Sequence, residues 1–103
     1  MKKVTIRVVE TMATAIFNHS YEEVVEYAVE NIMEITGGAT VDGESVGYWK
    51  DSNGKVVKEK GQNIWTLCED ESIEKLREVA MALQDFGEQD CVLFIVEDVK
   101  AEF

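Results

Sequence analysis

The stretch from residue 40 to residue 67 constrains the fold most, because it has the pattern of one long β-hairpin. Two β-rich runs, Thr40–Lys50 and Val56–Leu67, flank the segment Asp51-Ser52-Asn53-Gly54. Asn-Gly is a turn dipeptide because it accepts the positive φ that a tight hairpin turn requires. The sequence therefore predicts two long antiparallel strands in the middle of the chain.

Charge is segregated between this hairpin and the rest of the chain. Residues 48–63 contain four lysines and two acidic residues, a balance of +2, whereas the net charge of the chain is −11 and the remainder therefore carries −13. Phosphate contacts require clustered Lys and Arg, so direct binding to nucleic acid or to an anionic membrane is not expected. A basic protein surface is the macromolecular partner that this charge favours.

Length and composition predict one α+β domain over residues 1–103. The chain is 46% apolar, contains no proline and has neither a secretory signal pattern nor an apolar run long enough to cross a bilayer. We therefore expect a cytoplasmic protein. Cys68 and Cys91 lack the spacing of a metal or redox motif, and we expect both to be reduced thiols in the core.

Two helices are predicted, one on each side of the hairpin. Ser20-Tyr21-Glu22-Glu23 is a capping box that begins the first helix, and Gly37-Gly38 ends it. The second helix follows Glu69–Ser72 and stops at Gly87. The predicted apolar stripe of the first helix is Tyr21, Val25, Ala28, Val29, Ile32 and Ile35, and that of the second is Ile73, Leu76, Val79, Ala80, Leu83 and Phe86.

Two further strands are predicted near the ends of the chain. Residues 4–10 alternate as a first strand, and residues 11–19 have no clear period, so we expect a loop that packs onto the core. Cys91–Val96 is apolar on both faces, which is typical of a strand buried on both sides.

The predicted order β-α-β-β-α-β is that of the ferredoxin-like fold, an antiparallel sheet with two helices on one face. In this topology the first strand lies between the third and the fourth, and Cys68 and Cys91 are roughly 9–10 Å apart, too far for a disulfide. The opposite face would expose Val9, Trp65 or Ile64, and one alternating half of the last strand. An apolar patch of that kind predicts a homodimer that packs sheet against sheet.

A set of turn and strand motifs resembles a small bacterial family of ferredoxin-like domains of unassigned function. The resemblance covers about the last two thirds of the chain and implies this fold, without implying a chemistry. The matching positions are Gly38-x-Thr40-Val41, Gly47-x-Trp49, Gly54-x-Val56, Glu59 and Phe86-x-x-Gln89-x-x-Val92-Leu93.

No catalytic constellation, metal site or cofactor site is predicted, and we expect a protein that is not an enzyme. His19 could act as a general base, but no nucleophile with a spaced partner accompanies it. One histidine and two dispersed cysteines cannot form a zinc site, and the carboxylates lack calcium-loop spacing. An enzyme that uses His19 is the third hypothesis.

Two binding surfaces are predicted instead. Glu22, Glu26, Glu30 and Glu34 repeat every four residues along the first helix, and such a row of like charges predicts an acidic surface that docks on a basic, normally nucleic-acid-binding protein. By analogy with the small acidic inhibitors that phages encode, we expect a non-enzymatic binding module. The alternative is a nucleotide-like small-ligand binder or sponge whose site comprises Tyr48, Trp49, Lys50, Lys58 and Trp65.

Overall fold

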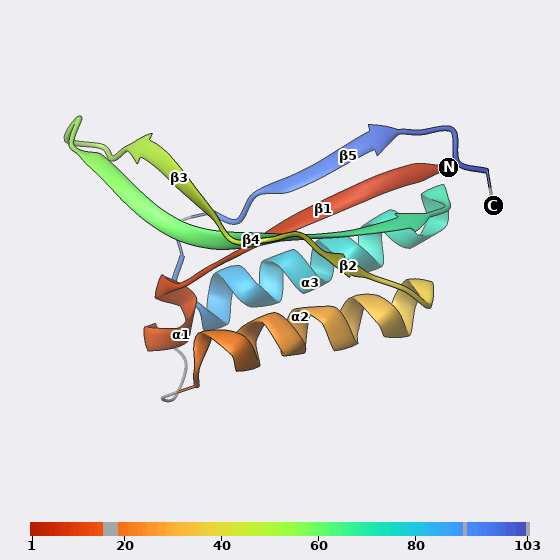
Figure 1. Cartoon of the computed structure of the whole chain (residues 1–103), viewed down its shortest axis with the longest axis horizontal. Coiled ribbons are helices and arrows are strands. Elements are labelled where there is room, and N and C mark those ends of the chain that lie inside the picture. Colours follow the sequence, from red (N-terminus) through yellow and green to blue (C-terminus); the bar gives the residue numbers. More distant parts are fainter. Residues whose placement is uncertain (16–18, 90, 103) are drawn as a thin grey trace.

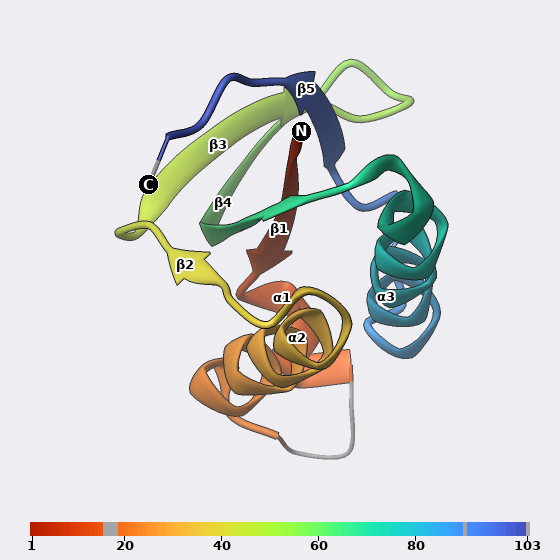
Figure 2. The same cartoon turned by 90° about the vertical axis from the view of Figure 1, so that its right-hand side faces the viewer.

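In the computed structural model, residues 1–15, 19–89 and 91–102 are described, without the side chains of residues 14 and 15. One antiparallel sheet packs its lower face on two long helices, α2 (Tyr21–Thr36) and α3 (Ile73–Phe86) (Figure 1, Figure 2). No helix formed by the described residues covers its other face (Figure 2). This arrangement confirms the predicted α+β architecture.

The sheet has the strand order β2-β4-β1-β5, and β3 pairs with the first half of β4. The strands are β1 (Lys2–Val9), β2 (Thr40–Val41), β3 (Ser45–Lys50), β4 (Val56–Cys68) and β5 (Phe94–Asp98). Val4 of β1 lies between Thr66 of β4 and Val96 of β5. The prediction that the first strand lies in the centre of the sheet is therefore confirmed.

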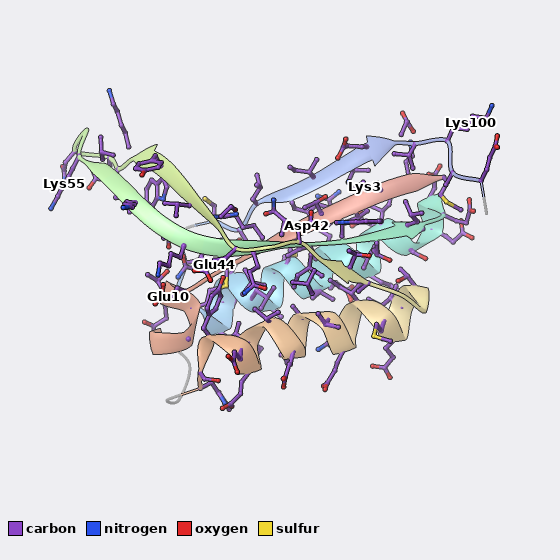
Figure 3. All side chains as sticks on the ribbon, viewed as in Figure 1. Lys3, Glu10, Asp42, Glu44, Lys55 and Lys100 are labelled. Atoms are coloured by element: carbon purple, nitrogen blue, oxygen red, sulfur yellow. The ribbon has the colours of Figure 1, made fainter. Side chains whose placement is uncertain are left out.

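The hairpin differs from the prediction in its first arm. Residues 42–44 separate β2 from β3, so the expected strand Thr40–Lys50 is interrupted, whereas β4 is continuous over 13 residues. At the tip, the Asp51 carboxylate accepts hydrogen bonds from the amides of Asn53 and Lys55, and Gly54 has a φ of 77°. Lys55 lies at the far end of the hairpin, beyond both helices (Figure 3).

Helix α2 (Tyr21–Thr36) begins and ends where the sequence predicts. The Ser20 hydroxyl accepts a hydrogen bond from the Glu23 amide, and Gly37 closes the helix in the left-handed conformation with a φ of 84°. α3 (Ile73–Phe86) follows a short 3-10 turn, η1 (Asp70–Ser72), and stops at Gly87. A third helix, α1 (Thr11–Ala15), was not predicted, because five residues are too few to give a helical period.

The core lies between the sheet and the helices. It consists of side chains from the lower face of β1 and β4 and from α1, α2 and α3. Met12 of α1 belongs to it and is only 1% exposed. Val24 is fully packed although the predicted stripe of α2 omitted it, and Phe86, predicted to be buried, is 59% exposed. The principal buried side chains are Val4, Ile6, Val8, Met12, Val24, Ala28, Ile32, Ile64, Leu76 and Leu83.

The last strand is an edge strand, and within one chain only one of its two faces is covered. Phe94 packs against the core, but Leu93 and Ile95 on the open face are 50% and 37% exposed. The segment Cys91–Val96 is apolar on both faces because alternate side chains face the helices and the others lie on the uncovered face of the sheet. Cys91, expected in the core, is exposed, whereas Cys68 is buried, and both are free thiols.

Within the described part of the chain, no helix has the length and apolarity needed to cross a membrane.

Candidate functional site

A groove of about 700 Å³ lies on the open face of the sheet. Its floor is formed by β1 and β4. Its walls are β3 on one side and, on the other, residues 88–89 and 91–93, which precede β5 (Figure 1). The residues that line the groove are Arg7, Val9, Met12, Gly47, Tyr48, Trp49, Glu59, Asn63, Glu88, Gln89, Cys91, Val92 and Leu93.

Trp49 and Glu59 form the hairpin side of the groove. The Trp49 indole Nε1 donates a hydrogen bond of 3.0 Å to Glu59 Oε1, and the Thr11 hydroxyl donates one of 2.6 Å to Glu59 Oε2. Gln89 Nε2 in turn lies 3.3 Å from the Thr11 hydroxyl. These contacts join β3, β4, α1 and the wall before β5, so the carboxylate and the indole are held in fixed positions.

Arg7 lies on the floor of the groove. Its Nη1 donates to the Ser45 hydroxyl at 2.8 Å and to Asn63 Oδ1 at 3.3 Å, and its Nη2 donates to the Ser45 carbonyl at 3.1 Å. The Arg7 backbone amide donates to the carbonyl of Leu93. Arg7 therefore contacts both walls, one through its side chain and one through its backbone.

Cys91 is an exposed thiol on the wall of the groove, and Cys68 is remote from it. Burial, and then the nearby Glu69, raise the pKa of the Cys68 thiol. The two cysteines therefore differ in accessibility, although their sequence contexts are equally apolar.

Only part of the predicted ligand site lies in this groove. Trp49 lines it, and Tyr48 borders it, although strand alternation places the Tyr48 side chain on the opposite face of β3. Lys50 and Lys58 are not among its lining residues. Trp65 is also outside it, and its Nε1 donates to Asp42 while the Lys3 ammonium lies 4.7 Å from the ring centroid.

The second predicted surface, the acidic face of α2, is present as a row of exposed side chains. Glu22, Glu26, Glu30 and Glu34 are all exposed, and among the described residues none of them forms an ion pair. The structure places this row on the helix layer, on the opposite side of the molecule from the groove.

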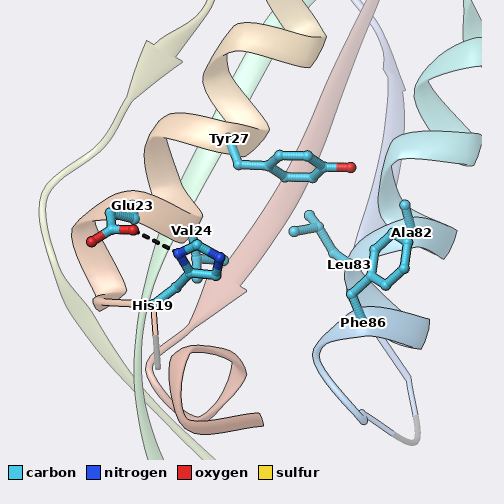
Figure 4. A pocket seen from close by; sticks show the side chains of 7 residues that line it. All are labelled: His19, Glu23, Val24, Tyr27, Ala82, Leu83 and Phe86. Carbon is cyan, nitrogen blue, oxygen red and sulfur yellow. Dashed lines mark hydrogen bonds and ion pairs between the residues drawn. The ribbon is translucent and has the colours of Figure 1, made fainter. Parts of the chain in front are cut away.

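A smaller cavity of about 250 Å³ lies between α2 and α3, next to this acidic row. It is mostly apolar, and Tyr27 and Phe86 face each other across it (Figure 4). His19 Nδ1 lies 2.6 Å from Glu23 Oε2 at one end, and this hydrogen bond, before any other contact, lowers the pKa of Glu23. His19 thus has a carboxylate partner, but no serine, threonine or cysteine among the described residues lines the cavity with it.

The groove brings together residues that sequence reasoning did not combine. Six positions of the family resemblance line it, although their motifs carried no chemical prediction. Arg7, Glu88 and Cys91 were missed because they come from segments separated by the whole hairpin or by α3. The six motif positions are Gly47, Trp49, Glu59, Gln89, Val92 and Leu93.

No group of three or more His, Cys, Asp or Glu side chains in the described ranges could hold a metal ion.

No family model matches the chain, and no curated protein sequence matches it significantly. Solved structures do match. The divalent cation tolerance protein CutA1 from Thermus thermophilus has a TM-score of 0.73 at 13% identity, over 100% of this chain and 88% of the other. CutA1 from Pyrococcus horikoshii has a TM-score of 0.65 at 16% identity, over 100% and 87% of the two chains.

A phage SAM lyase in complex with S-methyl-5′-thioadenosine also matches, with a TM-score of 0.70 at 17% identity over 94% of this chain and 80% of the other. The fold is ferredoxin-like. At these identities the similarity establishes the fold alone, and this small ferredoxin-like domain shares it with proteins of different function.

Proposed function

We propose that the protein binds S-adenosylmethionine, or a closely related adenosine thioether, in the groove on the open face of its sheet. The observation that carries this proposal is the composition of the groove, in which a fixed aromatic ring, a fixed carboxylate and a guanidinium share one cavity. The likeness to a phage SAM lyase solved with S-methyl-5′-thioadenosine supports the choice of ligand.

The groove suits the chemistry of this ligand group by group. An indole such as that of Trp49 offers a surface on which an adenine can stack. The sulfonium and ammonium groups are cations, which Glu59 and Glu88 attract and which an aromatic face also favours. A net charge of −11 likewise favours a cationic ligand over a polyphosphate. S-adenosylmethionine has a net positive charge and its neutral thioether relatives have none, whereas Lys50 and Lys58 suggested a nucleotide-like anion.

The same site accounts for either fate of the ligand. In a lyase reaction the α-carboxylate of S-adenosylmethionine would attack its own γ-carbon as the γ-carbon–sulfur bond breaks, giving homoserine lactone and neutral S-methyl-5′-thioadenosine. Because the nucleophile belongs to the ligand and the leaving thioether is neutral, this step requires neither a general acid nor a nucleophile from the protein. Binding followed by release of S-methyl-5′-thioadenosine would make the protein a lyase. Binding without release would make it a sponge, in agreement with the expectation that it is not an enzyme.

Homo-oligomerisation through the open face is part of this proposal. Leu93 and Ile95 are exposed there next to the groove, and an apolar patch of this kind favours burial against a second copy. A second copy packed on that face would also cover the mouth of the groove. We expect a homodimer or a larger homo-oligomer by light scattering at micromolar concentration.

Thermal-shift and calorimetric titrations test the binding proposal. S-adenosylmethionine and S-methyl-5′-thioadenosine should both stabilise the protein, by about 2.7 kcal/mol at a concentration a hundredfold above Kd, and ATP should not. Trp49→Ala and Glu59→Gln should weaken binding at least about tenfold, as loss of one stacking or charge-assisted contact does. Lys58→Ala, on the same strand but outside the groove, is the matched control. A flat screen with all adenosine compounds would overturn the proposal.

A second candidate function belongs to the helix layer. We propose that the acidic row of α2 docks on a basic segment of another protein, as a phage-type inhibitor would, and that the cavity between α2 and α3 receives one large apolar side chain of that segment. Tyr27 and Phe86, which are 41% and 59% exposed beside the acidic row, support this proposal. α2 contains no Lys or Arg that would repel such a partner.

A labelled basic helical peptide with a single central phenylalanine is a direct probe of this second function. We expect salt-sensitive binding that falls at least about fivefold when the phenylalanine is replaced by alanine or when Phe86 is replaced by alanine. If neither replacement changes the affinity, the peptide binds by general charge attraction alone, and the proposed apolar docking cavity is refuted.

A further inference from the structure

We propose that Arg7 is the carboxylate receptor of the groove, and that it binds the α-carboxylate of the amino-acid part of the ligand. This inference rests on the proposed adenosine-ligand function and deepens it. It predicts that the protein distinguishes ligands by the presence of that carboxylate.

The first observation is that the Arg7 guanidinium is held in place and still has donors to offer. Three of its N–H groups are used, on the hydroxyl and carbonyl of Ser45 and on the side-chain oxygen of Asn63. A guanidinium carries five N–H donors. Two of these donors therefore have no acceptor among the described residues. A planar guanidinium already fixed by other contacts loses little side-chain freedom when it binds a carboxylate.

The second observation is that the two hairpin strands leave space for this side chain. A Cβ placed on Gly61 would lie 2.7 Å from Arg7 Cζ and 2.8 Å from Nε and Nη2. A Cβ on Gly47 would lie 3.6 Å from Nη2. The guanidinium thus lies directly against the backbone of β4 at Gly61, and any side chain there would displace it.

The third observation is that the charge of Arg7 is not neutralised. The chain has 21 acidic residues, yet over the described residues no carboxylate lies within ion-pair distance of Arg7. Its side-chain partners are all neutral oxygens. Arg77, by comparison, pairs with Glu74 at 3.3 Å. A partly buried guanidinium without a counter-charge is suited to a charge-assisted pair with a ligand carboxylate.

A purely structural role for Arg7, that of joining β3 to β1 through Ser45, makes the opposite prediction for ligand choice. Removing the carboxylate from the ligand raises its net positive charge. An acidic protein without a dedicated receptor should then bind the decarboxylated ligand more tightly. A preference for the carboxylate therefore reports a local cation.

The test compares two thioethers that carry no sulfonium leaving group: S-adenosylhomocysteine and its decarboxylated analogue, S-adenosyl-3-thiopropylamine. By calorimetry, we expect the wild-type protein to bind the first about 10- to 100-fold more tightly. Arg7→Gln should abolish this preference. S-methyl-5′-thioadenosine, which has no carboxylate, is the third compound and should bind the wild-type protein. Ser45→Ala, which removes one contact of Arg7 but keeps the guanidinium, should retain most of the preference.

The outcomes separate the two proposals. Equal or inverted affinities for the pair in the wild-type protein, with S-methyl-5′-thioadenosine still bound, would overturn the role of Arg7 and leave the adenosine site standing. Failure of all three compounds to bind would overturn both. The wild-type comparison decides the matter even if Arg7→Gln does not fold.

Discussion

Replacing Gly61 by alanine should alter the groove without unfolding the protein. The new Cβ would lie within 2.7–2.8 Å of three guanidinium atoms of Arg7 and has no closer obstacle in the backbone. Because the obstacle is the end of a flexible side chain, Arg7 can swing away. The substitution therefore acts on the position of the guanidinium rather than on the strand.

The expected cost in stability is small. Displacing Arg7 breaks three hydrogen bonds to neutral oxygens, each with a net value of about 0.5–1.5 kcal/mol. Water in the open groove replaces part of them, and alanine restricts the unfolded chain relative to glycine by about 0.4–1 kcal/mol. We expect a net loss of about 1 kcal/mol in the free energy of unfolding, or about 4–8 °C in Tm.

Urea unfolding and ligand titration of Gly61→Ala together test this reasoning. The stability loss should stay near 1 kcal/mol while the preference for S-adenosylhomocysteine over its decarboxylated analogue disappears. A loss above about 3 kcal/mol would show that β4 itself cannot accept a side chain at this position. An unchanged preference would show that the guanidinium does not act from the place described.

Three further expectations concern other parts of the molecule. Gly87→Ala should destabilise the protein by at least about 1–3 kcal/mol in urea, because its Cβ would lie 2.5 Å from a backbone carbonyl of α3 and 2.8 Å from the buried methionine of α1; wild-type stability would contradict this. The folded-state pKa of Glu23 is lowered mainly by its hydrogen bond with His19. The stability that this bond contributes is therefore present above the unfolded-state pKa, about 4.3, and is lost as pH falls through the folded-state pKa. His19→Ala should make the urea midpoint depend less on pH between pH 5 and 3, and an unchanged pH dependence would refute the coupling. In the native protein a thiol reagent should modify Cys91 quickly and Cys68 only on unfolding, since one thiol is exposed and the other buried with a raised pKa; equal rates would be inconsistent with this structure.

Local signals predicted the elements well where they act within a few residues. The Ser20 hydroxyl and Gly37 begin and end α2 as expected, because capping depends on adjacent backbone groups. The Asn53-Gly54 turn is also where it was predicted. Helix α1 was missed since a single turn has no period, and the interruption of the first hairpin arm at residues 42–44 was missed because both halves are β-rich.

The groove could not be predicted in the same way, because it is assembled from distant segments. Arg7 comes from β1, Glu59 from β4 and Gln89 from the turn after α3. Trp49 was predicted as a binding residue and Glu59 was noted only as a position of the family resemblance, whereas Arg7, Glu88 and Cys91 were not predicted. Lys50 and Lys58, which were predicted to belong to the ligand site, lie outside the groove. Side chains alternate between the two faces of a strand, and the hairpin tip extends beyond the groove.

Burial of the last strand shows a related limit. An apolar run on both faces of a strand indicates burial on both sides only if something covers the second face. Here β5 lies at the edge of the sheet with Ile95 exposed. The chain itself leaves that face open, which is why a second copy enters the proposal.

The most direct measurement is a calorimetric titration of the wild-type protein with S-methyl-5′-thioadenosine, repeated with Trp49→Ala. The account predicts saturable binding with one site per chain and a loss of at least about tenfold in affinity for the variant. No heat of binding to the wild-type protein, or equal affinity of the two proteins, would contradict a ligand site in the groove.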